Sequence, residues 1–237
     1  MPMILGLDPS LQKTGYVVLD TDAPESEVVE RGLLKTSPKE GITVQRLIIQ
    51  SENVAAMISK YDIKFIGMEA PFFGAGSTEV LFALNQFLHR VFLETNAFVV
   101  CFPPQMLKKL VFPDISVAGV HKPHMIDKAK TALGLQGKRL AEDVADAYWA
   151  GTFGKRYYQW HISKSLSTDD LGEYEKHTFC GKHTYTRGPK KGITDLTGIV
   201  YRENELFFDF KSIKRRASER HAEKEKSKGK GSDRAKR

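Results

Sequence analysis

The spacing of apolar residues divides the first part of the chain into strand-like and helix-like segments. Apolar runs separated by turns with Asp and Pro predict three antiparallel strands over residues 3–8, 14–20 and 28–35. Apolar residues then recur at helical spacing over about residues 41–60, and residues 65–69 form a short apolar run that ends in Glu. This order predicts a meander of strands followed by a helix and a fourth strand.

The middle of the chain continues to alternate between helices and strands. The predicted elements are a helix over 78–95, a strand over 97–101, a helical turn over 105–110 and helices over 124–133 and 140–153. The apolar stripe of the 78–95 helix is wider than one packed face needs, so this helix buries two sides in its own subunit or one side in a partner subunit. The whole order predicts a mixed α/β layered fold.

The character of the sequence changes after residue 155. The chain becomes polar and then shows short β-like runs at residues 178–179, 184–185, 198–201 and 206–210. We therefore predict a main domain over residues 1–155 and a small β-rich extension over residues 156–210, followed by a basic, disordered tail over residues 211–237.

The basic charge of the protein is concentrated in that tail. Residues 211–237 hold 12 Lys and Arg against 4 Asp and Glu, which leaves 24 basic and 25 acidic residues for the rest of the chain. A basic block at one end is typical of an arm that binds nucleic acid, and a solubilising tail is the alternative.

The composition places the chain among soluble intracellular proteins. Hydrophobic residues make up 41% and charged residues 27% of the sequence. No apolar run approaches the roughly 18 residues of a membrane span, and the first residues show no pattern of a secretion signal. Two cysteines do not form a disulfide framework, so we expect a reducing compartment and a cytoplasmic location.

Four acidic residues stand where they could share one site. Asp8 and Glu69 each end a predicted strand, and Asp143 and Asp146 share one face of a helix because they are three residues apart. If these segments meet, the carboxylates repel one another unless divalent cations hold them. Oxygen ligands select magnesium or manganese, and two ions about 4 Å apart would clamp the attacking water and the leaving oxygen of a phosphodiester.

Three motifs around these acids resemble a known family. Residues 6–16 contain Gly-Leu-Asp-Pro followed by Thr-Gly-Tyr, residues 68–72 read Met-Glu-Ala-Pro-Phe, and residues 141–147 read Ala-Glu-Asp-Val-Ala-Asp-Ala. In order and spacing they resemble the RuvC-type Holliday-junction endonucleases. The resemblance covers residues 3 to about 153, and Ser10 stands where many members have Gly.

The resemblance implies a fold, an activity and an assembly. The fold would be RNase H-like, a mixed five-stranded sheet flanked by helices. The activity would be Mg²⁺-dependent cutting of four-way DNA junctions, with two ions per active site, Mn²⁺ as a substitute, and Asp8, Glu69, Asp143 and Asp146 as the ligands. Two symmetric nicks imply a homodimer. The size and the extension favour a tailed-phage member that works in the cytoplasm of a bacterial host.

Further residues are candidates for contacts with the DNA. Phe72 matches the position of an aromatic residue that stacks on an unpaired base, and Phe73 beside it is an equal candidate. Lys122 resembles a basic residue near the scissile phosphate. His121 is a candidate to assist the leaving group or the water. Lys108 and Lys109 are candidates for contacts with backbone phosphates.

Other functions remain open at this point. A broader nuclease for flaps or forks, or one that cuts RNA, would use the same carboxylates. An actin-like ATPase would need a Gly-rich turn after Asp8, where the chain has Pro9-Ser10. A protein that binds branched DNA without cutting it would not need all four acids.

Overall fold

The centre of the protein is one mixed β-sheet. The computed structural model describes residues 2–71, 78–180, 182–184 and 194–196. The five central strands are β1 (Met3–Asp8), β2 (Lys13–Asp20), β3 (Val28–Lys35), β4 (Phe65–Glu69) and β5 (Phe98–Phe102). They are arranged in the order β3-β2-β1-β4-β5, with β1 to β3 antiparallel and β4 and β5 parallel to β1. The predicted meander and the mixed sheet are confirmed.

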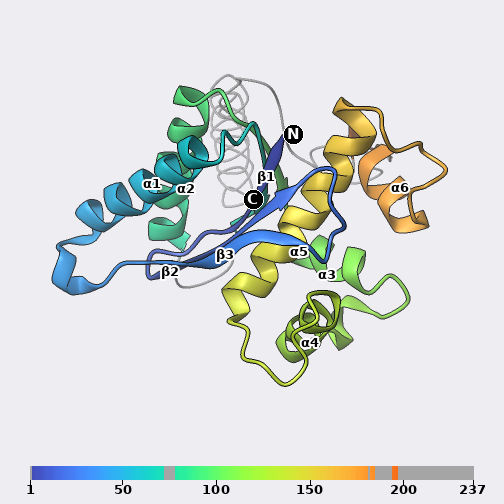
Figure 1. The fold of residues 1–237 in the computed structure, drawn as a ribbon, viewed down its shortest axis with the longest axis horizontal. Coiled ribbons are helices and arrows are strands. Elements are labelled where there is room, and N and C mark those ends of the chain that lie inside the picture. Colours follow the sequence, from blue (N-terminus) through green and yellow to red (C-terminus); the bar gives the residue numbers. More distant parts are fainter. Residues whose placement is uncertain (1, 72–77, 181, 185–193, 197–237) are drawn as a thin grey trace, which may run out of the picture. The chain divides into compact units, whose positions relative to one another are not determined.

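Helices cover both faces of the sheet (Figure 1). One face packs against α1 (Thr43–Lys60) and α2 (Thr78–Glu94), and the other packs against α5 (Glu142–Tyr157). The shorter elements before α5 are η1 (Pro38–Glu40), α3 (Pro104–Val111), η2 (Val117–Gly119) and α4 (Lys122–Ala132). Each helix predicted up to residue 153 is present, with ends that differ from the predicted ones by a few residues.

Three strand glycines let α5 lie directly on the sheet. A Cβ atom added at Gly6 would lie 2.2 Å from the backbone oxygen of Ala147, and one added at Gly67 would lie 2.1 Å from the backbone oxygen of Ala150. A Cβ added at Gly15 would lie 1.9 Å from the backbone oxygen of Asp143. Because these strands have no side chain at the contact, the α5 backbone approaches β1, β2 and β4 closely.

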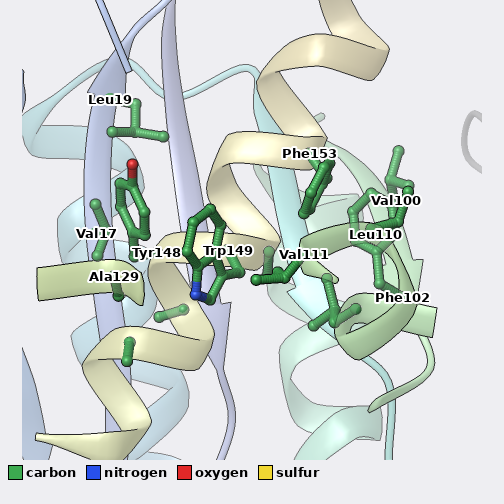
Figure 2. Packing of buried hydrophobic residues seen from close by; sticks show 14 of the residues in the cluster. Val17, Leu19, Val100, Phe102, Leu110, Val111, Ala129, Tyr148, Trp149 and Phe153 are labelled. Atoms are coloured by element: carbon green, nitrogen blue, oxygen red, sulfur yellow. The ribbon is translucent and has the colours of Figure 1, made fainter. Parts of the chain in front are cut away.

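The large side chains of α5 fill the space on either side of this close contact (Figure 2). Tyr148 and Trp149 are buried, and the Trp149 indole donates a hydrogen bond to the backbone oxygen of Met125 on α4 (3.2 Å). Phe153 packs in the same cluster with residues of β5 and α3. These contacts fix the position of α5 between the sheet and the shorter helices.

The C-terminal part of α5 is tied to the β2–β3 turn and to the chain that follows. The buried Lys155 donates hydrogen bonds from Nζ to the backbone oxygens of Asp20 (2.8 Å) and Ala23. Arg156 forms an ion pair with Glu175, which lies in α6 (Glu173–Cys180). The segment after the predicted boundary at residue 155 therefore packs on the main domain.

This segment is largely helical where the sequence predicted strands. A π-helix, η3 (Tyr158–Ile162), continues α5, and α6 includes Thr178 and Phe179, so the strand predicted at residues 178–179 is wrong. Phe179 is buried against the ring of Tyr157 at 5.3 Å between ring centres. An apolar residue next to Thr favours a strand locally, but contact with the aromatic residues of α5 selects a helix.

Two short strands follow α6. They are β6 (Lys182–Thr184) and β7 (Thr194–Leu196), which pair in antiparallel fashion. The β-like runs predicted over 198–201 and 206–210 and the basic tail over 211–237 lie outside the described residues. Within the described part of the chain, no helix is both long enough and apolar enough to cross a membrane.

Candidate active site

Asp8 and Glu69 end two neighbouring parallel strands at the same end of the sheet. In the register of β1 and β4, Leu7 lies beside Met68, so an acidic residue follows each of them. Neighbouring strands are about 4.7–4.9 Å apart. Both side chains keep partial exposure. The sheet therefore brings two of the predicted site residues together where solvent can reach them.

The first turns of α5 add Asp143 and Asp146 to the same place. The backbone of Asp143 lies over Gly15, which is the residue opposite Asp8 on β2. Ala147, next to Asp146, lies over Gly6 in the same way. Burial raises the pKa of Asp8, and the negative charges of Asp146 and Asp143 add to this rise.

Burial and mutual repulsion raise the pKa values of Asp8, Glu69 and Asp146. Burial raises the pKa of Asp8 well above its usual value, and the charges of Glu69 and Asp146 raise it further. Burial and then repulsion from Asp146 raise the pKa of Glu69 to about 8. Burial and the charge of Glu142 raise the pKa of Asp146 to about 6. Opposite charge placed among these groups would favour their ionised forms.

Two lysines supply part of that opposite charge. The positive charges of Lys122 and Lys108 oppose the rise in the pKa of Glu69. Lys122 begins α4, and its Nζ forms an ion pair with Glu142 at the start of α5. The predicted site residues Lys122 and Lys108 therefore lie within electrostatic reach of the carboxylates.

Glu142 is a site residue that the sequence reasoning missed. Its charge raises the pKa values of Asp8, Glu69 and Asp146, and it holds Lys122. The available signal was its place directly before Asp143 in the closing motif. A second signal was its spacing of four residues from Asp146, which puts these two acids on one face of the helix.

The loop that follows Asp8 is held by side chains of α1 and of the strand ends. The amide nitrogen of Gln50 donates to the backbone oxygens of Ser10 (3.2 Å), Leu11 (3.2 Å) and, on β3, Leu34 (3.0 Å). The hydroxyl of Thr14 donates to the backbone oxygen of Ser10 at 2.7 Å. Gln50 is completely buried. These hydrogen bonds fix the backbone immediately after Asp8.

Lys109 makes local contacts that differ from those of Lys108. Its Nζ donates to the backbone oxygens of Pro113 and Ile115 (3.4 Å), which closes the turn after α3. The same nitrogen lies 5.7 Å from the ring centre of Tyr174. Of the two neighbouring lysines, Lys108 is the one whose charge acts on Glu69 and Asp146.

The remaining predicted residues are a histidine and two phenylalanines. His121 caps the start of α4, where its backbone N–H donates to Nδ1 of His124 at 3.2 Å. It directly precedes Lys122 in the sequence. Phe72 and Phe73 lie outside the described residues.

The donor chemistry of the site fits a divalent cation. Among the described residues, no group of three or more His, Cys, Asp and Glu side chains is close enough to hold a metal ion as it stands. The four carboxylates nevertheless offer oxygen ligands only, and three of them have pKa values raised by burial and then by their like-charged neighbours. Magnesium and manganese prefer such ligands, and their charge offsets this repulsion.

The fold matches solved structures of one enzyme class. The structure "Thermus thermophilus RuvC structure" superposes with a TM-score of 0.56 at 15% identity, over 68% of this chain and 96% of that chain. The structure "T. thermophilus RuvC in complex with Holliday junction substrate" superposes with a TM-score of 0.53 at 16% identity, over the same shares. The fold is therefore the RNase H-like fold of these nucleases.

Comparison of the sequence identifies the family within this class. Residues 4–150 match the family "Crossover junction endodeoxyribonuclease RuvC". A relative of that name from Synechococcus sp. (strain CC9902) is 27% identical over 152 residues, which are 61% of this chain and 92% of the relative. Another, from Treponema denticola, is 27% identical over 149 residues, 62% of this chain and 81% of the relative. The chain belongs to the RuvC family of crossover junction endodeoxyribonucleases.

Proposed function

We propose that this protein resolves four-way DNA junctions by two symmetric, metal-dependent nicks. The observation that carries the proposal is the meeting of Asp8, Glu69, Asp143 and Asp146 where β1, β4 and α5 come together. Family membership supports the class of reaction. A related RuvC structure that was solved with a Holliday junction supports the class of substrate.

The four carboxylates would hold two divalent cations, Mg²⁺ with Mn²⁺ as a substitute. Bound cations would polarise the phosphodiester and lower the pKa of water at the site. The chain itself supplies the negative oxygen ligands. It also supplies the hydrogen bonds of Gln50 that fix the loop after Asp8. Water would attack phosphorus in line with the leaving oxygen, which leaves 5′-phosphate and 3′-hydroxyl ends.

Positive side chains beside the carboxylates would orient the DNA. Lys122 and Lys108 lie within electrostatic reach of Glu69 and Asp146. Lys122 is largely exposed, with 71% of its side-chain surface accessible, so it is free to contact a phosphate group beyond its ion pair with Glu142. We assign Lys122 to the scissile phosphate and Lys108 to a neighbouring one, with His121 and Lys109 at their margin. Phe72 and Phe73 would stack on bases at the crossover.

A homodimer would supply the second active site. The helix α2 buries Leu84 and Leu88 against its own core, but Val80 and Phe82 are 38% and 37% exposed. Val80 lies one turn before Leu84 on the same side of the helix, whereas Phe82 lies on another side. A two-fold pairing through this side of α2 would present two carboxylate sites to one junction. The cytoplasm of a bacterial host as its location and an origin in a tailed phage remain predictions.

The test is cleavage of synthetic DNA by the full chain. Labelled four-way junctions, flaps, forks and RNA–DNA hybrids are compared side by side in Mg²⁺, in Mn²⁺ and in EDTA. We expect paired nicks in the junction with either metal and none in EDTA. Faster cutting of flaps or forks would favour a broader branched-DNA nuclease, and faster cutting of hybrids would favour an RNA nuclease.

Matched variants separate the chemistry from DNA binding. Asp8→Asn and Asp146→Asn should abolish cutting while the protein still binds the junction in a gel-shift assay. Asp62→Asn is the control, because Asp62 forms an exposed ion pair with Lys64 before β4, at the other end of that strand from Glu69. Full cutting by Asp8→Asn would refute the assignment of the site.

A further inference from the structure

A cationic cavity lies next to the carboxylate site but outside it. Its volume is about 310 Å³, and β3 and the segment that leads into α5 form its walls. Three positively charged side chains line it, Arg31, Lys35 and Arg139, together with the apolar side chains of Leu33 and Val144. The three charged residues lie outside the motifs that carry the carboxylates, whereas Val144 belongs to the closing motif over residues 141–147.

The lining of this cavity carries positive charge and includes no acidic side chain. Arg31, Leu33 and Lys35 are every second residue of β3, so their side chains project on the same face of the sheet. Leu33 packs in the cluster of α5, so Arg31 and Lys35 also face the α5 side. Glu30 lies on the other face, where its carboxylate pairs with Lys60 at 2.7 Å. Within the described residues, Arg31, Lys35 and Arg139 form no ion pair.

A fourth cation adds to this surface. Lys13 on β2 lies directly opposite Lys35 on β3, and directly opposite residues of an antiparallel pair project on the same face. Like charges that face each other across two strands destabilise the pair. An anion bound beside them would remove this repulsion, which indicates that the surface is built to meet a negative ligand.

The register places the cavity at a fixed spacing from the active site. Asp8 lies opposite Gly15, and Gly15 lies opposite Leu33, so the cavity is level with the first carboxylate and two strands away from it. Two strand spacings amount to about 10 Å. One strand of duplex DNA advances about 3.4 Å along the axis for each phosphate and also turns around it, so phosphates about 10 Å apart are fewer than three nucleotides apart.

We propose that this cavity binds backbone phosphates of the DNA strand within about two nucleotides of the phosphodiester that is cut. Arg31 and Arg139 offer planar donors that match two phosphate oxygens at once, and Lys35 adds a point charge. Leu33 and Val144 offer an apolar wall for the sugar. The cavity thus holds one arm of the junction in line with the carboxylates, and this role rests on the function proposed above.

The first test is the salt dependence of DNA binding. The triple variant Arg31→Gln/Lys35→Gln/Arg139→Gln is compared with a control of equal charge change, Lys39→Gln/Lys64→Gln/Lys138→Gln, whose exposed residues do not line the cavity. Both are made in the Asp146→Asn background so that the DNA stays intact. Binding to a labelled four-way junction is followed by fluorescence anisotropy across a series of KCl concentrations.

We expect the triple variant to bind about ten-fold more weakly and to lose about 2–3 from the slope of log K against log[KCl], since each phosphate contact contributes about 0.9. The slope of the control variant should change by no more than about half of the 0.9 that one phosphate contact contributes. Equal slopes for the two variants would overturn the proposal. Melting curves by circular dichroism verify that both variants are folded.

The second test locates the phosphates. Junctions that carry a single neutral methylphosphonate are scanned along the cut strand. Groups within about two nucleotides of the cut should weaken binding of the Asp146→Asn protein but not of the triple variant, because that variant has already lost the contact. Equal losses for both proteins at every position would overturn the proposal.

These outcomes are separate from the outcome of the cleavage test. If the full chain with its carboxylates intact cuts no branched DNA, the proposed function is wrong, while the salt slopes and the methylphosphonate scan still decide whether the cavity binds phosphate. If it cuts junctions and the slopes are equal, the cavity proposal alone is wrong.

Discussion

The backbone oxygen of Ala150 on α5 occupies the space that a Cβ atom at position 67 of β4 would need, at a separation of 2.1 Å. This contact makes the position of two carboxylates depend on a glycine that carries no chemistry. Glu69 lies two residues beyond Gly67, and Asp146 lies one turn before Ala150. A change in the distance between helix and strand therefore changes the distance between those acids.

Gly67→Ala should lower both stability and cutting. The added methyl group would push α5 away from β4, and overpacking of this kind costs about 1–3 kcal/mol. The melting temperature should fall, and junction cutting at saturating Mg²⁺ should fall by more than the folded fraction does. Gly119→Ala is the matched control, because its added Cβ would meet only the Ile115 side chain at 3.5 Å. A Gly67→Ala protein as stable and active as its parent would show that the contact is not required.

Asp146→Asn should stabilise the metal-free protein while it abolishes cutting. Its pKa is raised to about 6 by burial and by like charges, so at pH 8 the ionised side chain opposes folding. Removal of that charge should add about 1–2 kcal/mol to the free energy of unfolding in EDTA. Urea unfolding in EDTA and in Mg²⁺ measures this, and the variant should gain less from Mg²⁺ than its parent does. Asp127→Asn, in an exposed pair with Lys130, is the control. A loss of stability in EDTA would contradict the repulsion argument.

Gln50→Leu should impair cutting more than it impairs folding. Leucine fills a similar volume but donates no hydrogen bond to the oxygens of Ser10 and Leu11. The loop after Asp8 therefore loses the hydrogen bonds that hold it to α1. Unpaired buried carbonyls cost about 1–3 kcal/mol. We expect a roughly ten-fold lower rate constant, the scale of a misplaced catalytic group, and a larger Mg²⁺ requirement. Gln50→Glu keeps the shape of the side chain and supplies a comparison. An unchanged Mg²⁺ requirement in both variants would exclude a role of Gln50 in positioning the loop after Asp8.

Glu30 should make the protein sensitive to acid. Its carboxylate accepts hydrogen bonds from Tyr16 (2.6 Å), from Lys60 (2.7 Å) and from Tyr61, which lower its pKa from 4.5 to about 2. A pKa that is lower in the folded state gives stability that is present above pH 4.5 and is lost as the pH falls toward 2. Urea unfolding between pH 5 and pH 2 should show this loss in the parent, and Glu30→Gln should flatten it. Parallel curves for the two proteins would show that Glu30 contributes nothing.

Much of the sheet was predictable because its signals are local. Each strand up to residue 102 is a short apolar run, and the acids at the ends of β1 and β4 stand out against apolar neighbours. The close approach of α5 was not predictable, because a strand glycine such as Gly6 or Gly67 does not reveal which backbone will lie on it. The helix α6 was misassigned because its conformation depends on contacts with α5, such as that of Phe179 with Tyr157.

The cationic cavity was beyond the reach of sequence patterns for a different reason. Arg31 and Arg139 are separated by more than one hundred residues, and each reads as an ordinary surface charge in its own segment. Only the packing of α5 beside β3 brings them to one cavity. By contrast, Lys122 was assigned from its spacing to the closing acids, and the structure brings it next to Glu142.

The order of the acidic residues along the chain determines when all four of them can come together during synthesis. Asp143 and Asp146 are translated long after Asp8 and Glu69, and they arrive at the site only when α5 docks on the strand glycines. A nascent or half-folded chain therefore lacks two of the four acids. If the four acids form the active site as proposed above, the chain gains its full set of ligands only when α5 has docked on the sheet.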